Sequence, residues 1–448
     1  MPRFEFTEGS SSKFWEITLE GTTLTKRWGR IGTDGQEKVE EFDSKAEAKK
    51  AYDSQIREKE GKGYTRVEAG EGDDGGEATA ESAVNPDLEA AILAKPDDVK
   101  GYLAYAEWLK GEGDPRAELI LLQHSALEAP AATRKKVATL IEAHANELLG
   151  ESLAEAVSDE TLKLEWHLGF IREARLGQVD YDSTADIPDL LAELLAHPSA
   201  RFLSRLTLGM ASFDGENDYD EALAVLAKAK PAPPLRSLFI GDFEFPDETE
   251  ISWTQVGDLK ALYKVYPQLQ ELRVRGGEIG FGKIDLPELR SFTVETGGLH
   301  QGAVKEIVKA KWPKLESLEI WFGQENYGAS GGVKDLQPLL DAEGVPALRK
   351  LGLRNAEFTD ELCAALPRSK ILAQIEALDL SMGTMSDAGA DTLAQNAKAF
   401  AHLKTLDVTQ NFLTKAGQKT VATVAKSVAS GNQRTPYDEE SRYAAVGE

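Results

Sequence analysis

A short aliphatic phrase recurs through the second half of the sequence, and it constrains the fold more than any other feature. The phrase is L-x-x-L-x-L, with aliphatic residues at the first, fourth and sixth places and mostly polar residues between them. Its copies are LRSLFI (235–240), LQELRV (269–274), LESLEI (315–320), LRKLGL (348–353), IEALDL (375–380) and LKTLDV (403–408). One copy cannot bury its aliphatic face alone, so the copies must stack into a continuous core with a parallel sheet along one wall.

With GFIREARL, FLSRLTL and LRSFTV included, we predict nine such strands between residues 170 and 408. From FLSRLTL onward, successive fourth-place residues are 20 to 34 positions apart, which in most cases leaves room for a helix between strands. The copies resemble leucine-rich repeats. The last two resemble the ribonuclease-inhibitor type, with Asn411 at the ladder asparagine place. The resemblance implies an α/β solenoid over residues 164–429.

The polar places of the phrase define a surface, because residues that flank the buried positions of a strand point to the opposite face. Among them, Phe239, Arg273, Arg275, Trp321 and Arg354 are the candidate partner-binding residues, since an exposed tryptophan flanked by arginines is typical of protein-binding hot spots. The alternative is an ordinary solvated sheet face. The whole predicted concave wall comprises Arg205, Thr207, Phe239, Glu271, Arg273, Arg275, Thr293, Glu295, Glu319, Trp321, Lys350, Arg354, Asp379, Asp407 and Thr409.

Residues 1–68 show a different pattern, that of a small antiparallel sheet with one helix on it. Three segments alternate apolar and polar residues, as strands do, and a lysine- and glutamate-rich helix follows until Gly61 and Gly63. The strand segments are KFWEITLEG (13–21), TTLTKRWGRIG (22–32) and QEKVEEF (36–42).

This first segment resembles the WGR domain, named for the triplet Trp28, Gly29 and Arg30. In DNA-dependent poly(ADP-ribose) polymerases the domain contacts nucleic-acid ends. The resemblance implies that Trp28 packs against sugar at a DNA or RNA end and that Arg30 reaches the backbone or a neighbouring domain, with Lys26 and Arg27 adding positive charge. Yet residues 1–68 carry 13 basic and 14 acidic residues, without the basic footprint of most nucleic-acid modules. Two other interpretations stay open: protein contact through the same face, and a structural role for Trp28 and Gly29.

The remaining segments connect, cap and end the chain. Residues 69–85 carry five acids and no base, which predicts a flexible linker. Residues 86–163 read as helices, and YAEWLKGEGDPRAELILLQ resembles the helical repeat-companion domain of some bacterial proteins; a solenoid end needs such a cap. Residues 430–448 are polar and predict a flexible tail. The combination is similar to bacterial proteins that join WGR and leucine-rich repeats.

Composition and motifs argue against several functional classes. The net charge of −25 disfavours broad adhesion to nucleic acid or anionic membranes. Cys363 is the one cysteine and lies among leucines, which favours a buried thiol; six histidines without paired spacing, His167 among them, predict no metal site. The glycine-rich pieces 275–283 and 328–335 lack phosphate-loop spacing and predict loops between repeats.

The sequence thus predicts a non-catalytic cytoplasmic adaptor without cofactor, metal or membrane span, which binds a protein partner on its concave wall. A protein that senses nucleic-acid ends through Trp28 and Arg30 is the alternative. An enzyme with a site between cap and solenoid is a third. The N-terminus has no apolar run behind basic residues, and no stretch reaches membrane-spanning length, which favours the cytoplasm.

Overall fold

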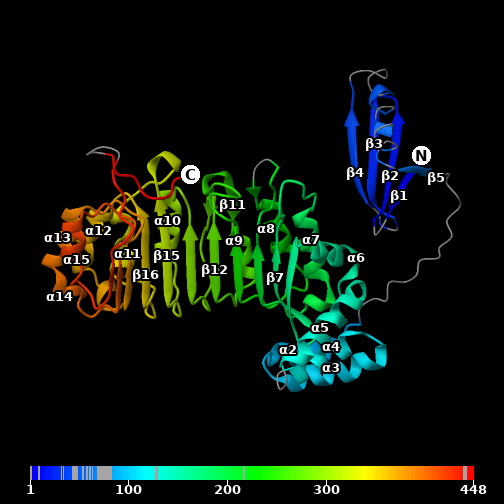
Figure 1. Ribbon diagram of the computed structural model, residues 1–448, viewed down its shortest axis with the longest axis horizontal. Helices are drawn as coiled ribbons and strands as arrows, with labels where there is room; N and C mark the ends of the chain where they lie inside the picture. The colour runs from blue at the N-terminus through cyan, green and yellow to red at the C-terminus, as the bar shows by residue number, and fades with distance from the viewer. Residues whose placement is uncertain are drawn as a thin grey trace. The chain divides into compact units, whose positions relative to one another are not determined.

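The computed structural model describes most of the chain, and its helices and strands fall into two compact units, Met1–Glu81 and Ser82–Glu448 (Figure 1). The described residues are 3–8, 11–31, 33, 35–42, 49–52, 55, 56, 59, 62, 64–67, 83–126, 130–214, 217–436 and 441–448.

The N-terminal unit contains a five-stranded antiparallel sheet in the order β4-β3-β2-β1-β5. Its core comes from alternate residues of one sheet face, among them Phe4, Trp15 and Ile17, against which Tyr52 and Ile56 of a helical segment pack. Residues 49–52, 55, 56 and 59 are helical, and the rest of the predicted helix lies outside the described residues. The strands are β1 (Arg3–Glu8), β2 (Ser11–Glu20), β3 (Thr23–Arg30), β4 (Gln36–Glu41) and β5 (Thr65–Val67).

The second unit begins with helices. The side chain of Asn85 caps the first one by accepting a hydrogen bond from the Leu88 N–H at 3.2 Å, and Gly113, in a left-handed conformation, ends the second. Tyr102 and Tyr105 bury their rings against Phe170 of the adjoining sheet, so this block covers the start of the sheet as a cap should. The helices are α2 (Pro86–Ala94), α3 (Val99–Glu112), α4 (Arg116–Ala126), α5 (Pro130–Ala143) and α6 (Ala145–Ser158).

A large sheet forms the body of the second unit, and its eleven described strands follow one another in chain order. All neighbouring pairs are parallel except the first, in which β6 pairs antiparallel with β7. One strand per turn, with each connection crossing the same side, is the geometry of a solenoid. The strands are β6 (Leu162–His167), β7 (Phe170–Leu176), β8 (Arg205–Leu208), β10 (Ser237–Ile240), β12 (Glu271–Arg275), β14 (Ser291–Glu295), β15 (Ser317–Gly323), β16 (Lys350–Ala356), β17 (Ala377–Asp379), β18 (Thr405–Asp407) and β19 (Val428–Ala429).

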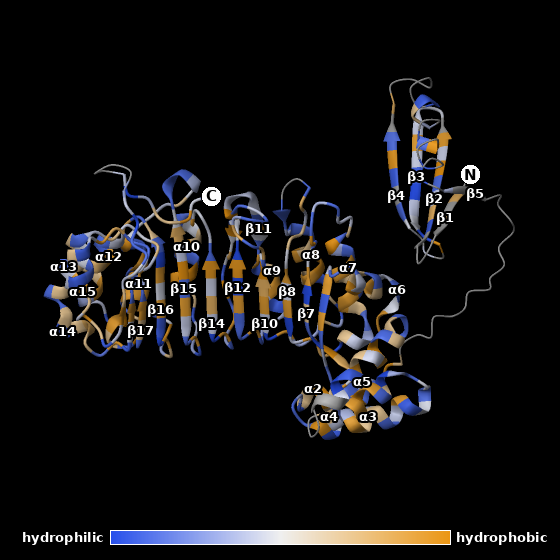
Figure 2. Cartoon of the chain, viewed as in Figure 1, coloured by the Kyte–Doolittle hydropathy of each residue, from blue (hydrophilic) through white to orange (hydrophobic). Residues whose placement is uncertain are grey.

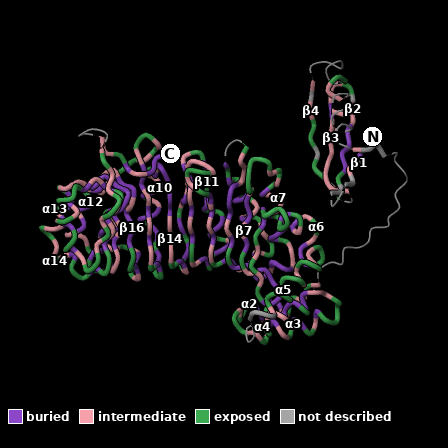
Figure 3. Tube along the Cα trace, in the orientation of Figure 1, coloured by how far each residue is buried: buried purple, intermediate pink, exposed green. Residues whose placement is uncertain are grey.

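The register of this sheet aligns the aliphatic phrase across the strands. The fourth-place residues pair in one continuous row: Ala174, Leu206, Leu238, Leu272, Phe292, Leu318, Leu351, Leu378, Leu406 and Val428. Nearly all of these side chains are fully buried, and hydrophobic and hydrophilic residues alternate along the strands (Figures 2 and 3). All nine predicted strands are present.

Helices cover one side of the sheet and leave the other side open (Figure 1). They are α7 (Ile187–Ala196), α8 (Asp220–Lys228), α9 (Lys260–Val265), α10 (Gln301–Lys309), α11 (Gln337–Leu340), α12 (Thr359–Ala365), α13 (Asp387–Gln395), α14 (Ala397–Phe400) and α15 (Lys415–Val421). Short 3₁₀ turns complete the connections: η1 (Pro198–Ala200), η2 (Ile251–Trp253), η3 (Glu325–Tyr327), η4 (Val333–Leu336), η5 (Leu366–Arg368) and η6 (Ile371–Ala373).

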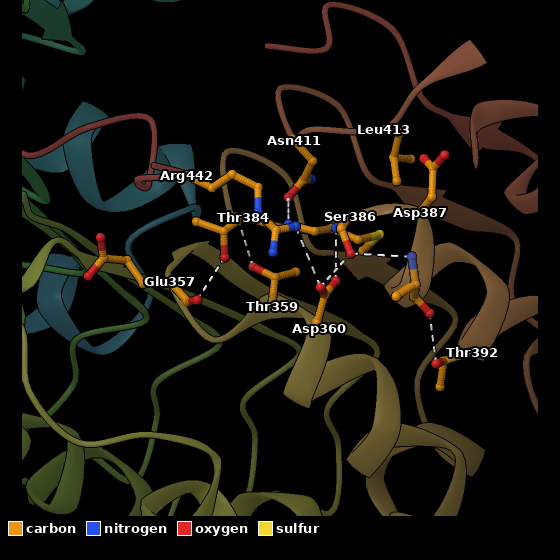
Figure 4. A network of polar contacts seen from close by, with 12 residues as sticks. Glu357, Thr359, Asp360, Thr384, Ser386, Asp387, Thr392, Asn411, Leu413 and Arg442 are labelled. Atoms are coloured by element: carbon orange, nitrogen blue, oxygen red, sulfur yellow. Dashed lines mark hydrogen bonds and ion pairs between the residues drawn. The ribbon is translucent and has the colours of Figure 1, made fainter. Parts of the chain in front are cut away.

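A carboxylate ladder joins the last turns of the solenoid. Asp360 at the start of α12 accepts hydrogen bonds from the N–H and hydroxyl groups of Ser386 at 2.9 and 2.6 Å (Figure 4). One turn later, Asp387 accepts the same pair from Thr414, also at 2.9 and 2.6 Å. The cap residue of each of these helices is therefore bound to a carboxylate of the preceding turn. Such charge-assisted hydrogen bonds are stronger than hydrogen bonds between neutral groups.

The predictions of a loop at 275–283, a flexible linker at 69–85 and a flexible tail at 430–448 are each wrong in part. Residues 275–283 are not all loop, because β13 (Gly277–Gly280) pairs with β11 (Thr254–Asp258), which pairs with β9 (Asn217–Asp218), in a second, three-stranded parallel sheet.

The predicted flexible linker lies outside the described residues except at 83–85, and these are fixed. The Ala83 carbonyl accepts a hydrogen bond at 2.5 Å from Arg116, a buried guanidinium that also pairs with Asp114. A buried arginine needs such acceptors, and the linker end supplies one.

The predicted flexible tail, residues 430–448, is wrong for residues 430–436 and 441–448, which lie against the solenoid. Gln433 donates to the Val408 carbonyl at 2.9 Å, and Ala444 and Val446 are buried. The sequence prediction rested on the polar composition of the segment and did not take its few buried apolar residues into account.

Candidate functional site

The open face of the large sheet carries the residues that the sequence singles out. Strand pairing places Phe239 beside Arg273, and Trp321 beside Arg354, on neighbouring strands. Two separate clusters result, one on β10–β14 and one on β15–β17.

In the first cluster, two arginines share one carboxylate. Arg273 lies over the Phe239 ring at 4.2 Å and contacts Glu295 at 2.8 Å. Arg275 contacts the other oxygen of Glu295 at 2.5 Å and donates to the Phe243 carbonyl at 2.6 Å. Glu295 is buried, its side chain only 5% exposed, so both guanidinium groups are held in place from below.

In the second cluster, one arginine contacts two carboxylates. Arg354 stacks on the Trp321 ring at 5.0 Å and contacts Glu319 at 2.6 Å and Asp379 at 3.3 Å. The Trp321 indole N–H donates to Glu319 at 2.8 Å. Burial raises the pKa of Asp379 above its ordinary value of 3.8, although the Arg354 charge opposes that rise and the nearby Asp407 adds to it.

Trp321 is half-buried rather than exposed, because Arg354 covers its ring and an apolar cluster around Met382 and Val446 packs against it. The sequence prediction of an exposed tryptophan is wrong at this position. Trp253, on η2, is 69% exposed, and no pattern in the sequence separates it from a core residue.

A hollow of about 400 Å³ lies in the open face next to the second cluster. Its rim carries the carboxylates of Glu319, Asp379 and Asp407, which occupy one cross-strand row with Gly352 between the first two. Several outward places here hold small residues, among them Ser317, Gly352 and Ala377. The lining is Ser317, Leu318, Glu319, Lys350, Leu351, Gly352, Ala377, Leu378, Asp379, Thr405, Leu406, Asp407, Ser427 and Ala429. Three carboxylates around a shallow hollow can bind a cationic side chain.

In the N-terminal unit, the predicted binding residues divide between the two faces of the sheet. Side chains alternate along β3, so Lys26, Trp28 and Arg30 share one face, whereas Arg27 and Gly29 belong to the other. The alternation of side chains along a strand could have predicted this division between faces from the sequence alone.

The Lys26 face is the one that packs on the helical segment. Trp28 lies opposite Trp15 in the sheet register and packs against the core. Lys26 contacts Glu40 at 2.9 Å, and this hydrogen bond lowers the pKa of the Glu40 carboxyl. Part of the predicted positive charge is thus neutralised inside the unit.

On the other face, Gly29 is required by packing. Phe14 is buried below Arg27, whose guanidinium lies 5.5 Å from the ring centre, and the Gly35 backbone crosses close above Gly29. A Cβ on Gly29 would lie 2.7 Å from the Gly35 Cα atom, closer than such atoms approach in proteins. Gly29 therefore has a structural role.

Cys363 and His167, the residues that invite a catalytic or metal role, differ in exposure. Cys363 is fully buried, and burial raises its thiol pKa. His167 is exposed at the end of β6 but packs edge-on against Tyr102, and partial desolvation there lowers its pKa. Within the described ranges, no group of three or more histidine, cysteine or acidic side chains could hold a metal ion. None of the described helices combines the length and the apolar character that crossing a membrane requires.

Comparison with known proteins identifies the N-terminal unit and supports the fold. Residues 2–71 match the WGR domain family, so the predicted resemblance is confirmed there. No curated protein matches the sequence. A crystal structure of a Bacteroides fragilis protein is 23% identical, covers 100% of both chains and superposes with a TM-score of 0.56, which shows a shared fold. An internalin from Listeria monocytogenes is 11% identical over 67% of this chain and 95% of its own, but its TM-score of 0.30 establishes no shared fold.

Proposed function

We propose that the protein is a non-catalytic cytosolic adaptor, in which a leucine-rich-repeat solenoid over residues 164–429 binds a protein partner on its open, concave wall. The WGR domain serves as a second recognition module. The observation that carries the proposal is the hollow beside Arg354, with its three rim carboxylates.

The partner segment presents a lysine or arginine side chain to this hollow. Arg354 balances part of the charge of Glu319 and Asp379, and Lys350 is a second cation in the lining, but Asp407 has no cation within ion-pair distance among the described residues. Three carboxylates thus face two cations. The hollow therefore keeps a negative excess. A cation added beside a row of partly buried carboxylates contributes on the order of 1.5–3 kcal/mol, about ten- to hundredfold in affinity.

Peptide binding tests the proposal. Blocked octapeptides that differ only in a central Lys, Arg, Gln or Glu are titrated against the full chain by fluorescence anisotropy. We expect Lys and Arg peptides to bind at least tenfold more tightly than Glu peptides, and Asp379→Asn/Asp407→Asn to remove the preference. Asp391→Asn/Glu361→Gln, an equal charge change at exposed positions of α13 and α12, is the control. Equal affinity for all four peptides would contradict the proposal.

The WGR match favours a second candidate, recognition of nucleic-acid ends. Because Arg27 and Arg30 lie on opposite faces, single substitutions identify the face that is used. Blunt-ended DNA and RNA duplexes are titrated against the full chain in a salt series, with Trp28→Ala, Arg30→Ala and Arg27→Ala compared. Loss of binding with Arg30→Ala alone places the site on the Trp28 face. Absence of binding at the lowest salt, where phosphate contacts are strongest, excludes this candidate.

A further inference from the structure

Residues 441–448 run back along the solenoid and lie at the carboxyl ends of β15 and β16 (Figure 1). Their backbone groups form hydrogen bonds with backbone and side-chain groups of the solenoid. The Ala445 N–H donates to the Met382 carbonyl at 2.8 Å, and the Gln324 side chain donates to the Ala444 carbonyl at 3.0 Å.

Asn355 is the centre of this contact. Its side-chain amide accepts a hydrogen bond from the Val446 N–H at 2.9 Å and donates one to the Val446 carbonyl at 2.7 Å. One amide therefore pairs with both backbone groups of one residue. Asn355 is fully buried and has a φ of 54°, in the left-handed region. Among the described residues, Val446 supplies both hydrogen-bond partners of this amide. Without the segment, a buried amide would lose its partners, which costs about 1–3 kcal/mol.

The groove also selects side chains. Val446 and Ala444 are 6% and 2% exposed, and Val446 belongs to the apolar cluster that includes Met382, Phe243 and the edge of Trp321. At the next position a Cβ on Gly447 would lie 2.6 Å from the Tyr327 ring, so a larger residue would require that ring to move.

Arginine anchors the segment on the carboxylate ladder. Arg442 donates to the Thr384 carbonyl at 3.3 Å and lies 3.7 Å from the Asp360 carboxylate (Figure 4). These contacts are longer and more exposed than those of Val446, so they orient the segment more than they hold it.

We infer that this groove is a peptide receptor, which takes from a partner protein an extended segment of the pattern Arg-x-small-small-Val-Gly, in competition with residues 442–447 of the chain itself. Three features carry the inference: a buried amide that pairs with both backbone groups of Val446, a socket for valine, and a glycine position where a Cβ would meet the Tyr327 ring. The ligand chemistry is that of the segment seated there. The receptor does not depend on the concave hollow, whose carboxylates Asp379 and Asp407 take no part in it.

The test supplies the peptide in trans to the full chain. Val446→Asp places a charge in the apolar socket and displaces the chain's own segment. A labelled, blocked peptide of residues 441–448 should bind this variant at least tenfold more tightly than it binds the wild-type chain. Adding Asn355→Ala to Val446→Asp should abolish binding, and a peptide with Asp in place of the valine is the control. Equal weak binding by both chains would overturn the inference.

Hydrogen exchange of the wild-type chain keeps the test decisive if the variants fold poorly. We expect protected amides at Ala445 and Val446, and unprotected ones would overturn the inference, since the groove would then not hold the segment. Formation of a dimer by the intact chain, lost with Val446→Asp, would show that a second copy fills the groove, and would overturn the assignment to a different protein.

Discussion

The two arginine–aromatic clusters of the open sheet face use the same residue types in opposite proportions. On β10–β14, Arg273 and Arg275 share the single carboxylate of Glu295. On β15–β18, Arg354 alone faces Glu319 and Asp379, with Asp407 on the next strand. Within these contacts, arginines outnumber carboxylates in the first cluster, and carboxylates outnumber arginines in the second. Since strands lie about 4.8 Å apart, the two clusters are about 20 Å apart, the reach of a short partner segment with an acid and a base.

The strongest way to break this comparison is Glu295→Gln. The substitution leaves two arginines side by side above the core without their shared carboxylate. We expect a loss of about 3 kcal/mol in the free energy of unfolding, because removing one partner of a buried ion pair leaves the remaining charges without compensation. Urea denaturation followed by circular dichroism measures it. Glu271→Gln, which removes an exposed partner of Arg205, should cost less than about 1 kcal/mol.

A smaller effect is expected from Arg354→Ala, about 2 kcal/mol at neutral pH. Because burial raises the pKa of Asp379, the folded state favours its protonated form, and this carboxyl adds stability as pH falls through its folded-state pKa. Removing Arg354 raises that pKa further. The deficit of the variant should therefore shrink from pH 7 toward pH 4. A deficit that grows on acidification would contradict the assignment.

Ala377→Phe sharpens the comparison with the least effect on stability. The new ring would enter the hollow from the outward side of β17 and should weaken cationic peptides at least tenfold, while the unfolding free energy changes by less than about 1 kcal/mol. Ser237→Phe, in the same cross-strand row but on β10, is the matched control. Equal losses from both substitutions would show that the hollow is not the site.

The strands of the solenoid were predictable because the aliphatic phrase determines both which residues are buried and how the strands align. The row from Leu206 to Leu406 follows directly from matching the fourth places of the phrase. Strands outside the phrase were missed. β13 has the glycine-rich sequence GEIG, and it pairs with β11 in the connections between the repeat strands.

The site was predictable as a surface but not as a set of contacts. The candidate arginines lie on the open face as expected, yet which carboxylate each contacts depends on the exact strand register and on neighbouring side chains. Glu295 shows the difficulty, because its position in the phrase indicates a surface residue whereas Arg273 and Arg275 cover it. The hydrogen bonds between Asn355 and Val446 connect residues 91 positions apart in the sequence, and no local sequence pattern predicts them.

The carboxylate ladder has a consequence for how the solenoid comes apart. Asp360 and Asp387 each clamp the helix cap of the following turn, so no turn between residues 359 and 417 can open without breaking a link to its neighbour. A chain of nearest-neighbour links makes unfolding cooperative. The amides of α12, α13 and α15 should therefore exchange with solvent deuterium at a common opening free energy, as a single foldon.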